Sequence, residues 1–218
     1  MAILAEGEVA RQVEAGWLDP AWWQRRDAVR KELGGRGQAV LVASPIGALV
    51  LRRFRRGGLA ARFSADRYWA PGRERSRGFR EFRLLQVLAS QGLPVPDPVA
   101  ASYERDGLFY RAGLLTRLIP DACELAEVAA GLSFEQWRDL AMTLDAFFAA
   151  GLCHPDLNAR NLLLDRHGRW HLLDLDRARL VGRRVDSKAM RQRLARSLGK
   201  LPDSGWRTGF TKTLGKDI

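Results

Sequence analysis

The feature that most constrains this chain is the stretch His154–Asp176, in which polar residues alternate with short apolar runs. Two of these runs, 161–165 and 169–174, each predict a short buried strand, and a turn that contains a glycine separates them. In such a hairpin Asn161 starts the first strand and Asp174 ends the second. Both side chains are therefore expected at the same end of the ladder.

Asp156 lies in the loop just before this hairpin, close to the end that carries Asn161 and Asp174. A free carboxylate facing a carboxylate and a carboxamide that share a cation is the arrangement phosphoryl transfer needs. We predict Asp156 as the catalytic residue and Asn161 and Asp174 as ligands of the cation. The alternative is an ordinary core hairpin with incidental acids at its rim.

The order and spacing of these three residues behind His154 resemble the protein-kinase-like superfamily, whose catalytic loop reads His-x-Asp-x-x-x-x-Asn and is followed by a metal-binding Asp. The resemblance implies an α+β protein with a small bilobal protein-kinase-like fold. It implies a β-rich nucleotide-binding lobe over residues 1–118 and a mainly helical catalytic lobe over 119–218. It also implies that His154 supports the loop, that the cation is Mg²⁺ and that ATP is the phosphate donor.

A second set of candidate residues lies in the predicted strand 48–54. Side chains alternate between faces along a strand, so Val50 and Arg52 share one face. The kinase-like resemblance implies that Arg52 stands where the family has a phosphate-binding lysine and that Val50 covers the adenine. Arginine is a departure from that pattern, and Arg53 on the opposite face is the alternative. Glu81, on the following helix, is implied to aim the cation at the phosphates.

The region before this strand predicts a first helix over residues 20 to 33, with Asp19 as its N-cap and a proline in its first turn. A glycine-rich segment follows. Gly35 and Gly37 could let backbone N–H groups approach ATP phosphates. The same glycines could equally form the C-cap of the helix.

Other local patterns complete the expected order of elements. A strand is predicted over 38–43, and an apolar stripe predicts a helix over 79–91. Two further strands, 100–103 and 108–116, lead into a predicted hinge. A capping box then opens a helix over 133–150 that leads to the catalytic loop.

The net charge of +11 and the isoelectric point near 10.7 imply an anionic partner. Nine basic residues and one acidic residue lie between Arg177 and Lys200. A solvated basic face is one interpretation, and contact with an anionic lipid or sugar phosphate is the other. The residues predicted to contact substrate or membrane are Arg177, Arg179, Arg183, Arg184 and Arg191.

The end of the chain argues against a peptide substrate. Few residues follow Asp176, which leaves little room for an activation segment and the helices that bind peptides in protein kinases. Asp176 also stands where the Asp-Phe-Gly motif has its glycine. A small-molecule or glycolipid acceptor is therefore expected. With two cysteines the chain has no disulfide framework, and a cytoplasmic protein is expected.

Several segments resemble one branch, the bacterial 3-deoxy-D-manno-octulosonic acid (Kdo) kinases of lipopolysaccharide core assembly. The segments that carry the resemblance are 50–59, 80–85, 92–96, 154–163 and 173–178. The resemblance implies ATP-dependent phosphorylation of the 4-hydroxyl of Kdo on a Kdo-lipid A precursor. It implies a peripheral protein on the cytoplasmic face of the inner membrane, with no nucleic acid as partner. The alternatives are a minimal RIO-like Ser/Thr kinase and a basic nucleic-acid-binding pseudokinase.

Overall fold

The computed structural model describes residues 1–33, 39–54, 68–69, 72–183, 185–202 and 205–215. The chain divides into two compact units, one of residues 1–86 and 97–118 and the other of residues 87–96 and 119–218. One boundary thus falls between residues 118 and 119, where the sequence places the end of the first lobe. The segment 87–96 groups with the second unit, whereas the sequence assigns it to the first.

The first unit is built on an antiparallel sheet, in which the order of the main path is β1-β6-β7-β4-β3-β2 and β5 pairs with β7. Its strands are β1 Ala2–Leu4, β2 Val29–Leu33, β3 Ala39–Ser44, β4 Gly47–Arg53, β5 Tyr68–Trp69, β6 Pro98–Asp106 and β7 Phe109–Arg117. The four strands predicted in this region are confirmed as β3, β4, β6 and β7.

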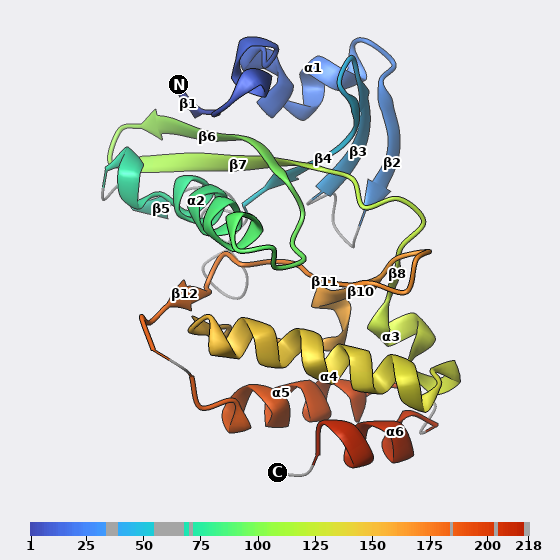
Figure 1. The fold of residues 1–218 in the computed structure, drawn as a ribbon. Coiled ribbons are helices and arrows are strands. Elements are labelled where there is room, and N and C mark those ends of the chain that lie inside the picture. Colours follow the sequence, from blue (N-terminus) through green and yellow to red (C-terminus); the bar gives the residue numbers. More distant parts are fainter. Residues whose placement is uncertain (34–38, 55–67, 70–71, 184, 203–204, 216–218) are drawn as a thin grey trace. The chain divides into compact units, whose positions relative to one another are not determined.

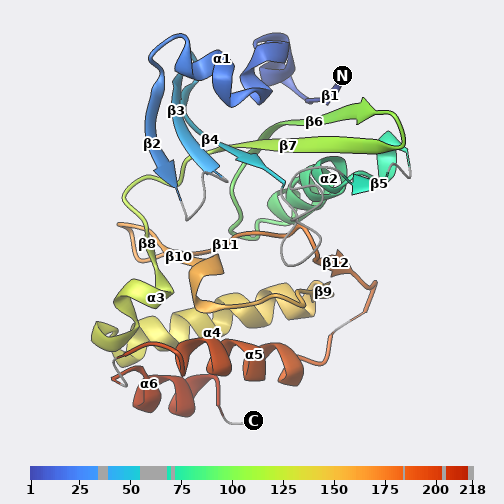
Figure 2. The same cartoon turned by 180° about the vertical axis from the view of Figure 1, so that it is seen from behind.

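Short helices and one long helix accompany this sheet. They are η1 Glu8–Arg11, η2 Ala15–Leu18, α1 Pro20–Gln24, η4 Arg73–Arg75 and α2 Arg77–Ser90. In Figures 1 and 2, η2 and α1 lie on one side of the sheet and α2 on the other. The helix predicted over 79–91 is confirmed as α2.

The predicted helix over residues 20–33 is wrong beyond its first turns. The Asp19 side chain caps the helix as expected, accepting from the backbone N–H of Ala21 at 3.0 Å. The helix ends at Gln24, and Asp27 then adopts a left-handed φ of 53°. No apolar stripe of helical spacing continues past this point, and the following residues pair with β3 as β2 instead.

The same finding bears on the glycine-rich segment. A strand, and not a helix, precedes it, so the helix C-cap interpretation of these glycines is wrong. Gly35 and Gly37 themselves lie outside the described residues. Their predicted contact with ATP phosphates stays a prediction.

The core of the first unit explains which strand residues face which side. Trp17, Leu18 and Trp23 pack on the sheet against a cluster that includes Leu49 and Leu51. The indole N–H of Trp23 donates to the Trp17 carbonyl at 2.7 Å. Full burial of such side chains stabilises a fold by about 1.5–3 kcal/mol each. Because side chains alternate along β4, Val50 and Arg52 are directed to the opposite face of the sheet.

The second unit is mainly helical and contains two small sheets. Its helices are α3 Leu125–Val128, η5 Ala129–Gly131, α4 Phe134–Ala149, η6 Ala159–Asn161, α5 Lys188–Leu198 and α6 Trp206–Thr213. Its strands are β8 Cys123–Glu124, β9 Leu152–Cys153, β10 Leu162–Leu164, β11 Trp170–Leu172 and β12 Arg179–Leu180. β10 pairs with β11 and β8, and β9 pairs with β12.

The long helix α4 begins with the capping box that the sequence predicts. The Ser133 hydroxyl accepts from the Gln136 backbone N–H at 3.2 Å, and the Gln136 side chain accepts from the Ser133 N–H at 2.9 Å. Helix α6 packs closely on α4. A Cβ at Gly209 would come within 2.2 Å of the Trp137 ring, so this contact requires glycine. Within the described part of the chain, no helix has the length and apolar character needed to cross a membrane.

Candidate active site

The hairpin of β10 and β11 brings Asn161 and Asp174 to one end of its ladder, as the sequence predicts. Leu162 pairs with Leu172 at this end, and both leucines are buried. Beyond this pair the Leu173 N–H donates to the Asn161 carbonyl at 2.8 Å. The residue after Leu173 is Asp174. One predicted metal ligand, Asn161, is therefore hydrogen-bonded through its backbone to the residue that precedes the other.

Asp156 is held in place through its backbone. Its carbonyl accepts from the side-chain amide of Asn158 at 2.8 Å and from that of Asn161 at 3.2 Å. The next residue, Leu157, is fully buried. The side chain of Asp156 is 38% exposed, which leaves it open to a substrate.

His154 precedes Asp156 by two residues and is almost fully buried. Its Nε2 lies 3.2 Å from the carbonyl oxygen of Leu173, and its backbone N–H donates to the Met190 sulfur at 3.2 Å. Burial lowers the pKa of His154, although the Leu173 carbonyl and the Asp174 and Asp156 carboxylates act in the opposite direction. The ring is therefore neutral near pH 7, with the Nε2–H donating to the carbonyl.

Asp174 adopts a left-handed backbone conformation with φ of 56°. Aspartate tolerates this region better than most residues, and such conformations in non-glycine residues gather at functional sites. Within the described residues no three His, Cys, Asp or Glu side chains form a metal-binding group. Mg²⁺ needs fewer protein ligands, because it binds one or two carboxylates together with phosphates and water. The oxygen atoms of Asn161 and Asp174 fit that requirement.

Arg177 forms an ion pair with the Asp156 carboxylate. Its Nη1 donates to Asp156 Oδ2 at 3.1 Å, while its side chain is 67% exposed. The sequence places Arg177 in a basic surface patch and does not reveal this contact. The contact depends on the pairing of β9 with β12, where Arg179 lies opposite Cys153.

In the first unit, Arg52 and Glu81 form an ion pair. Glu81 comes from α2, and its side chain is almost fully buried, so the cation holds a carboxylate that has lost most of its water. Arg53 is on the other face of β4. Its Nη1 donates to the Leu18 carbonyl at 3.4 Å, and it borders a cavity of about 440 Å³. Arg52 rather than Arg53 therefore has the glutamate partner that the kinase-like resemblance implies.

Comparison with known proteins identifies the family. The model of the lipopolysaccharide kinase (Kdo/WaaP) family matches residues 20–212. The chain belongs to this family. The Kdo/WaaP-family kinase described here is thus a phosphotransferase that acts on a hydroxyl group, and its kinase-like α+β fold is the one predicted.

Individual relatives agree with this assignment. The chain is 43% identical over 205 residues to a 3-deoxy-D-manno-octulosonic acid kinase of Xylella fastidiosa strain M23, covering 92% of this chain and 81% of the relative. It is 45% identical over 206 residues to the enzyme of that name from Xanthomonas campestris pv. campestris strain B100, with the same coverage.

Solved structures share the fold. A structure described as WaaP in complex with acyl carrier protein has a TM-score of 0.59 at 14% identity, covering 100% of this chain and 90% of that chain. A kinase of Cydia pomonella granulovirus, PK-1, has a TM-score of 0.50 at 15% identity, covering 73% of this chain and 55% of that chain.

The predicted basic patch of this Kdo/WaaP-family kinase does not hold together as one exposed surface. Arg179 and Arg183 are exposed, and Arg184 lies outside the described residues. The prediction for Arg191 is wrong, because its side chain is only 7% exposed. Arg191 forms an ion pair with Asp145 of α4 and donates to the Ser187 hydroxyl and the Leu214 carbonyl. It joins α5 to α4 and to the end of α6, which is a structural role.

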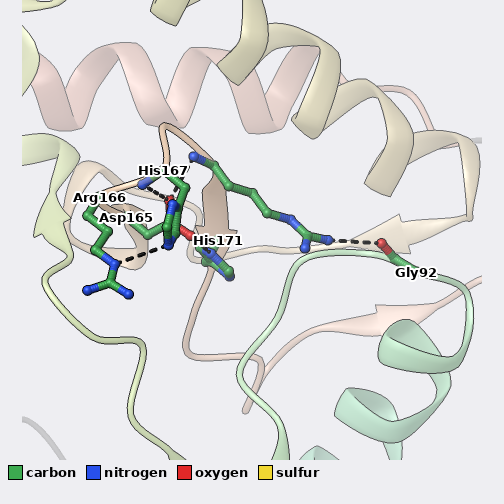
Figure 3. A network of polar contacts seen from close by, with 6 residues as sticks. Gly92, Asp165, Arg166, His167 and His171 are labelled. Carbon is green, nitrogen blue, oxygen red and sulfur yellow. Dashed lines mark hydrogen bonds and ion pairs between the residues drawn. The ribbon is translucent and has the colours of Figure 1, made fainter.

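The turn of the hairpin contains a polar network that the sequence pattern does not reveal (Figure 3). One Asp165 oxygen accepts from the backbone N–H groups of His167 and Arg169, each at 2.9 Å, and the other lies 2.9 Å from His171 Nε2. Burial alone would raise the pKa of Asp165, but these hydrogen bonds outweigh it and lower the pKa. The network fixes the tip of the hairpin, and thereby the register that places Asn161 and Asp174.

Proposed function

We propose that this kinase transfers the γ-phosphoryl group of ATP to the 4-hydroxyl of Kdo on a Kdo-lipid A precursor. The observation that carries the proposal is the end of the hairpin. There the backbone of Asn161 is hydrogen-bonded to Leu173, the residue before Asp174, and the side-chain amide of Asn161 donates to the Asp156 carbonyl. The acceptor is supported by relatives named as 3-deoxy-D-manno-octulosonic acid kinases at 43% and 45% identity over most of the chain.

Asp156 accepts, or at least orients, the proton of the attacking hydroxyl. Its half-exposed carboxylate can approach a substrate, while its backbone is held by two amide side chains. A general base must lie within hydrogen-bond reach of the proton it removes. Fixing the backbone limits the carboxylate to rotation about its side-chain bonds, and so reduces the entropy lost when it aligns with the hydroxyl.

Asn161 and Asp174 would hold Mg²⁺ through their side-chain oxygens. The amide nitrogen of Asn161 donates to Asp156, so its Oδ1 is the atom that can bind a cation. The metal, when bound, neutralises charge on the phosphates of ATP. His154 supports this site by hydrogen bonding to the residue before Asp174, and its neutral ring carries no charge that would repel the metal.

The nucleotide is proposed to be bound by residues of the first unit. Arg52, paired with Glu81, would hold phosphate oxygens, since a guanidinium matches a phosphate with two parallel N–H groups. Val50 lies on the same face of β4 and would cover the adenine. Gly35 and Gly37 are proposed to approach the phosphates through their backbone N–H groups.

Membrane contact is proposed for the exposed basic residues after the hairpin. Arg179 and Arg183 are exposed, and α5 adds three exposed cations, Lys188, Arg193 and Arg196. Each basic side chain near an anionic leaflet contributes about 1 kcal/mol of attraction. The protein would then act as a peripheral enzyme at the cytoplasmic face of the inner membrane, where an acidic glycolipid acceptor is found.

The proposal is tested by incubating the purified protein with Mg²⁺, ATP and a panel of acceptors. The panel contains a Kdo-bearing lipid A precursor, the same precursor without Kdo and a mixed protein substrate. We expect mass spectrometry to find one added phosphoryl group on the Kdo-bearing precursor alone. Phosphate on protein and none on the glycolipid would favour the RIO-like alternative. Tight RNA binding without transfer to any acceptor would favour the pseudokinase alternative.

A further inference from the structure

Arg177 stands out because it contacts the proposed catalytic carboxylate and is still largely exposed. Its Nη1 donates to Asp156 Oδ2 at 3.1 Å, and 67% of its side chain faces solvent. We propose that Arg177 binds the carboxylate of the acceptor sugar and so positions the acceptor hydroxyl at Asp156. This inference rests on the proposed function, because it takes Asp156 as the residue that receives the hydroxyl.

The backbone of Arg177 is fixed although its side chain is exposed. Leu175 and Ala178 on either side are buried, and the Ala178 N–H donates to the Leu175 carbonyl at 2.9 Å, which closes a turn around Arg177. The β9–β12 ladder begins immediately afterwards, with Arg179 opposite Cys153. The turn and the ladder together place Arg177 beside the loop of Asp156.

The charges of the proposed reaction favour a cation at this place. The acceptor is a sugar acid, so its own carboxylate must come close to the carboxylate of Asp156. Two like charges at short range repel each other, more strongly where water is excluded. A guanidinium between them offsets this repulsion.

Arginine is suited to bind both groups at once. It has five N–H donors in a planar fork, and one of those of Arg177 donates to Asp156 Oδ2. The fork matches a second carboxylate with two parallel hydrogen bonds. The exposed side of the Arg177 guanidinium can therefore bind an anion. Because the same guanidinium is hydrogen-bonded to Asp156, it fixes how far that anion lies from the Asp156 carboxylate. A neutral sugar would gain nothing from it.

The ATP γ-phosphate is the other anion that could use this guanidinium. The two assignments differ in which Michaelis constant they affect. A residue that binds the acceptor carboxylate changes kcat/KM for the acceptor, whereas one that binds the γ-phosphate changes the KM for ATP. A residue that only stabilises the loop would lower the rate equally for acceptors with and without a carboxylate.

The test compares wild type with Arg177→Gln and Arg177→Lys, each on the Kdo-bearing precursor and on the same precursor with its Kdo carboxylate converted to a methyl ester. Arg138→Gln is the matched control, since Arg138 is an exposed arginine of α4. Thermal unfolding shows whether the variants are folded.

We expect esterification to lower kcat/KM of wild type by about 10- to 100-fold, the range for a lost charged hydrogen-bond pair. Arg177→Gln should show a similar loss on the acid and little further loss on the ester, with an unchanged KM for ATP. Arg177→Lys should recover part of the loss on the acid.

Two results would overturn the role of Arg177 but leave the proposed function standing. One is an equal loss of kcat/KM on acid and ester in Arg177→Gln, and the other is a rise in the KM for ATP in that variant. If wild type phosphorylates neither acceptor, the proposed function itself fails.

Discussion

The Nε2 of His154 lies 3.2 Å from the carbonyl oxygen of Leu173. This hydrogen bond joins the start of the loop that carries Asp156 to the residue that precedes Asp174. The histidine is almost fully buried, and its ring links the two segments through this bond. The positions of the proposed base and the proposed metal ligand are thus coupled through one neutral imidazole.

The first prediction concerns how His154 makes stability depend on pH. Burial keeps its pKa below the ordinary value of about 6.5, so unfolding adds a proton between the two values. The free energy of unfolding of wild type should therefore fall as pH drops below about 6.5. We expect the free energy of unfolding of His154→Gln to fall less than that of wild type between pH 7.5 and 5.5, as measured by urea unfolding at the two pH values. His167→Gln, at an exposed position, is the control and should keep the wild-type decrease. Parallel pH profiles for wild type and His154→Gln would contradict the assignment.

The second prediction concerns the Arg52–Glu81 ion pair. Glu81→Gln keeps the shape of the side chain but removes the charge that directs Arg52, so the KM for ATP should rise about 10-fold or more. Arg52→Lys should retain more activity than Arg52→Ala, because a lysine still offers a cation. Steady-state kinetics with varied ATP measures both effects. Arg53→Ala is the comparison, and a larger rise in the KM for ATP from Arg53→Ala than from Arg52→Ala would reverse the assignment.

The third prediction follows from the burial of Arg191. Arg191→Ala removes hydrogen bonds to Asp145, Ser187 and Leu214, and should lower the free energy of unfolding by about 2 to 4 kcal/mol. Arg193, an exposed residue of the same helix, is the matched control, and its alanine variant should differ by less than about 0.5 kcal/mol. Urea unfolding provides the comparison. An Arg191→Ala protein of normal stability that loses binding to anionic vesicles would instead support a surface role.

The residues of the hairpin could be predicted from sequence because their positions depend on local pattern. Two apolar runs, a turn with glycine and the spacing of three polar residues determine which of them share an end of the ladder. The alternation of side chains along β4 likewise separates Arg52 from Arg53. Local patterns of this kind need no knowledge of distant contacts.

Other features depend on contacts between distant residues, and the sequence did not reveal them. Arg177 reaches Asp156 because β9 pairs with β12, and two-residue strands leave no recognisable pattern. Composition alone groups Arg191 with the exposed cations. It lies next to the apolar stripe of Met190, Leu194 and Leu198, and helical spacing alone could have marked it as half-buried.

The first helix was extended too far for a related reason. Helical propensity continues after Gln24, but Val29–Leu33 pairs with β3, and this pairing depends on residues that are not adjacent in the sequence. The signal that favoured a strand was weak, since the middle of this segment is exposed on both faces.

The fourth prediction concerns the network at the hairpin turn. Asp165→Asn removes a charge that accepts three hydrogen bonds, and should lower the free energy of unfolding at pH 7 by about 1.5 to 3 kcal/mol. The pKa of Asp165 is lowered in the folded protein, so this stabilisation is present above the unfolded value of about 4 and is lost as pH falls below it. Unfolding at pH 7 and pH 3 measures the difference, with the exposed Asp139→Asn as control. A difference that stays constant between the two pH values would show that charge plays no part.

The most direct measurement of the central claim is the rate at which one phosphoryl group appears on the Kdo residue of the lipid A precursor, for wild type and for Asp156→Asn. The substitution keeps the size of the side chain and the backbone hydrogen bonds from Asn158 and Asn161, so the variant should fold normally. We expect wild type to transfer the group to Kdo and the variant to be at least about 100-fold slower. A folded Asp156→Asn protein with the wild-type rate would contradict the account.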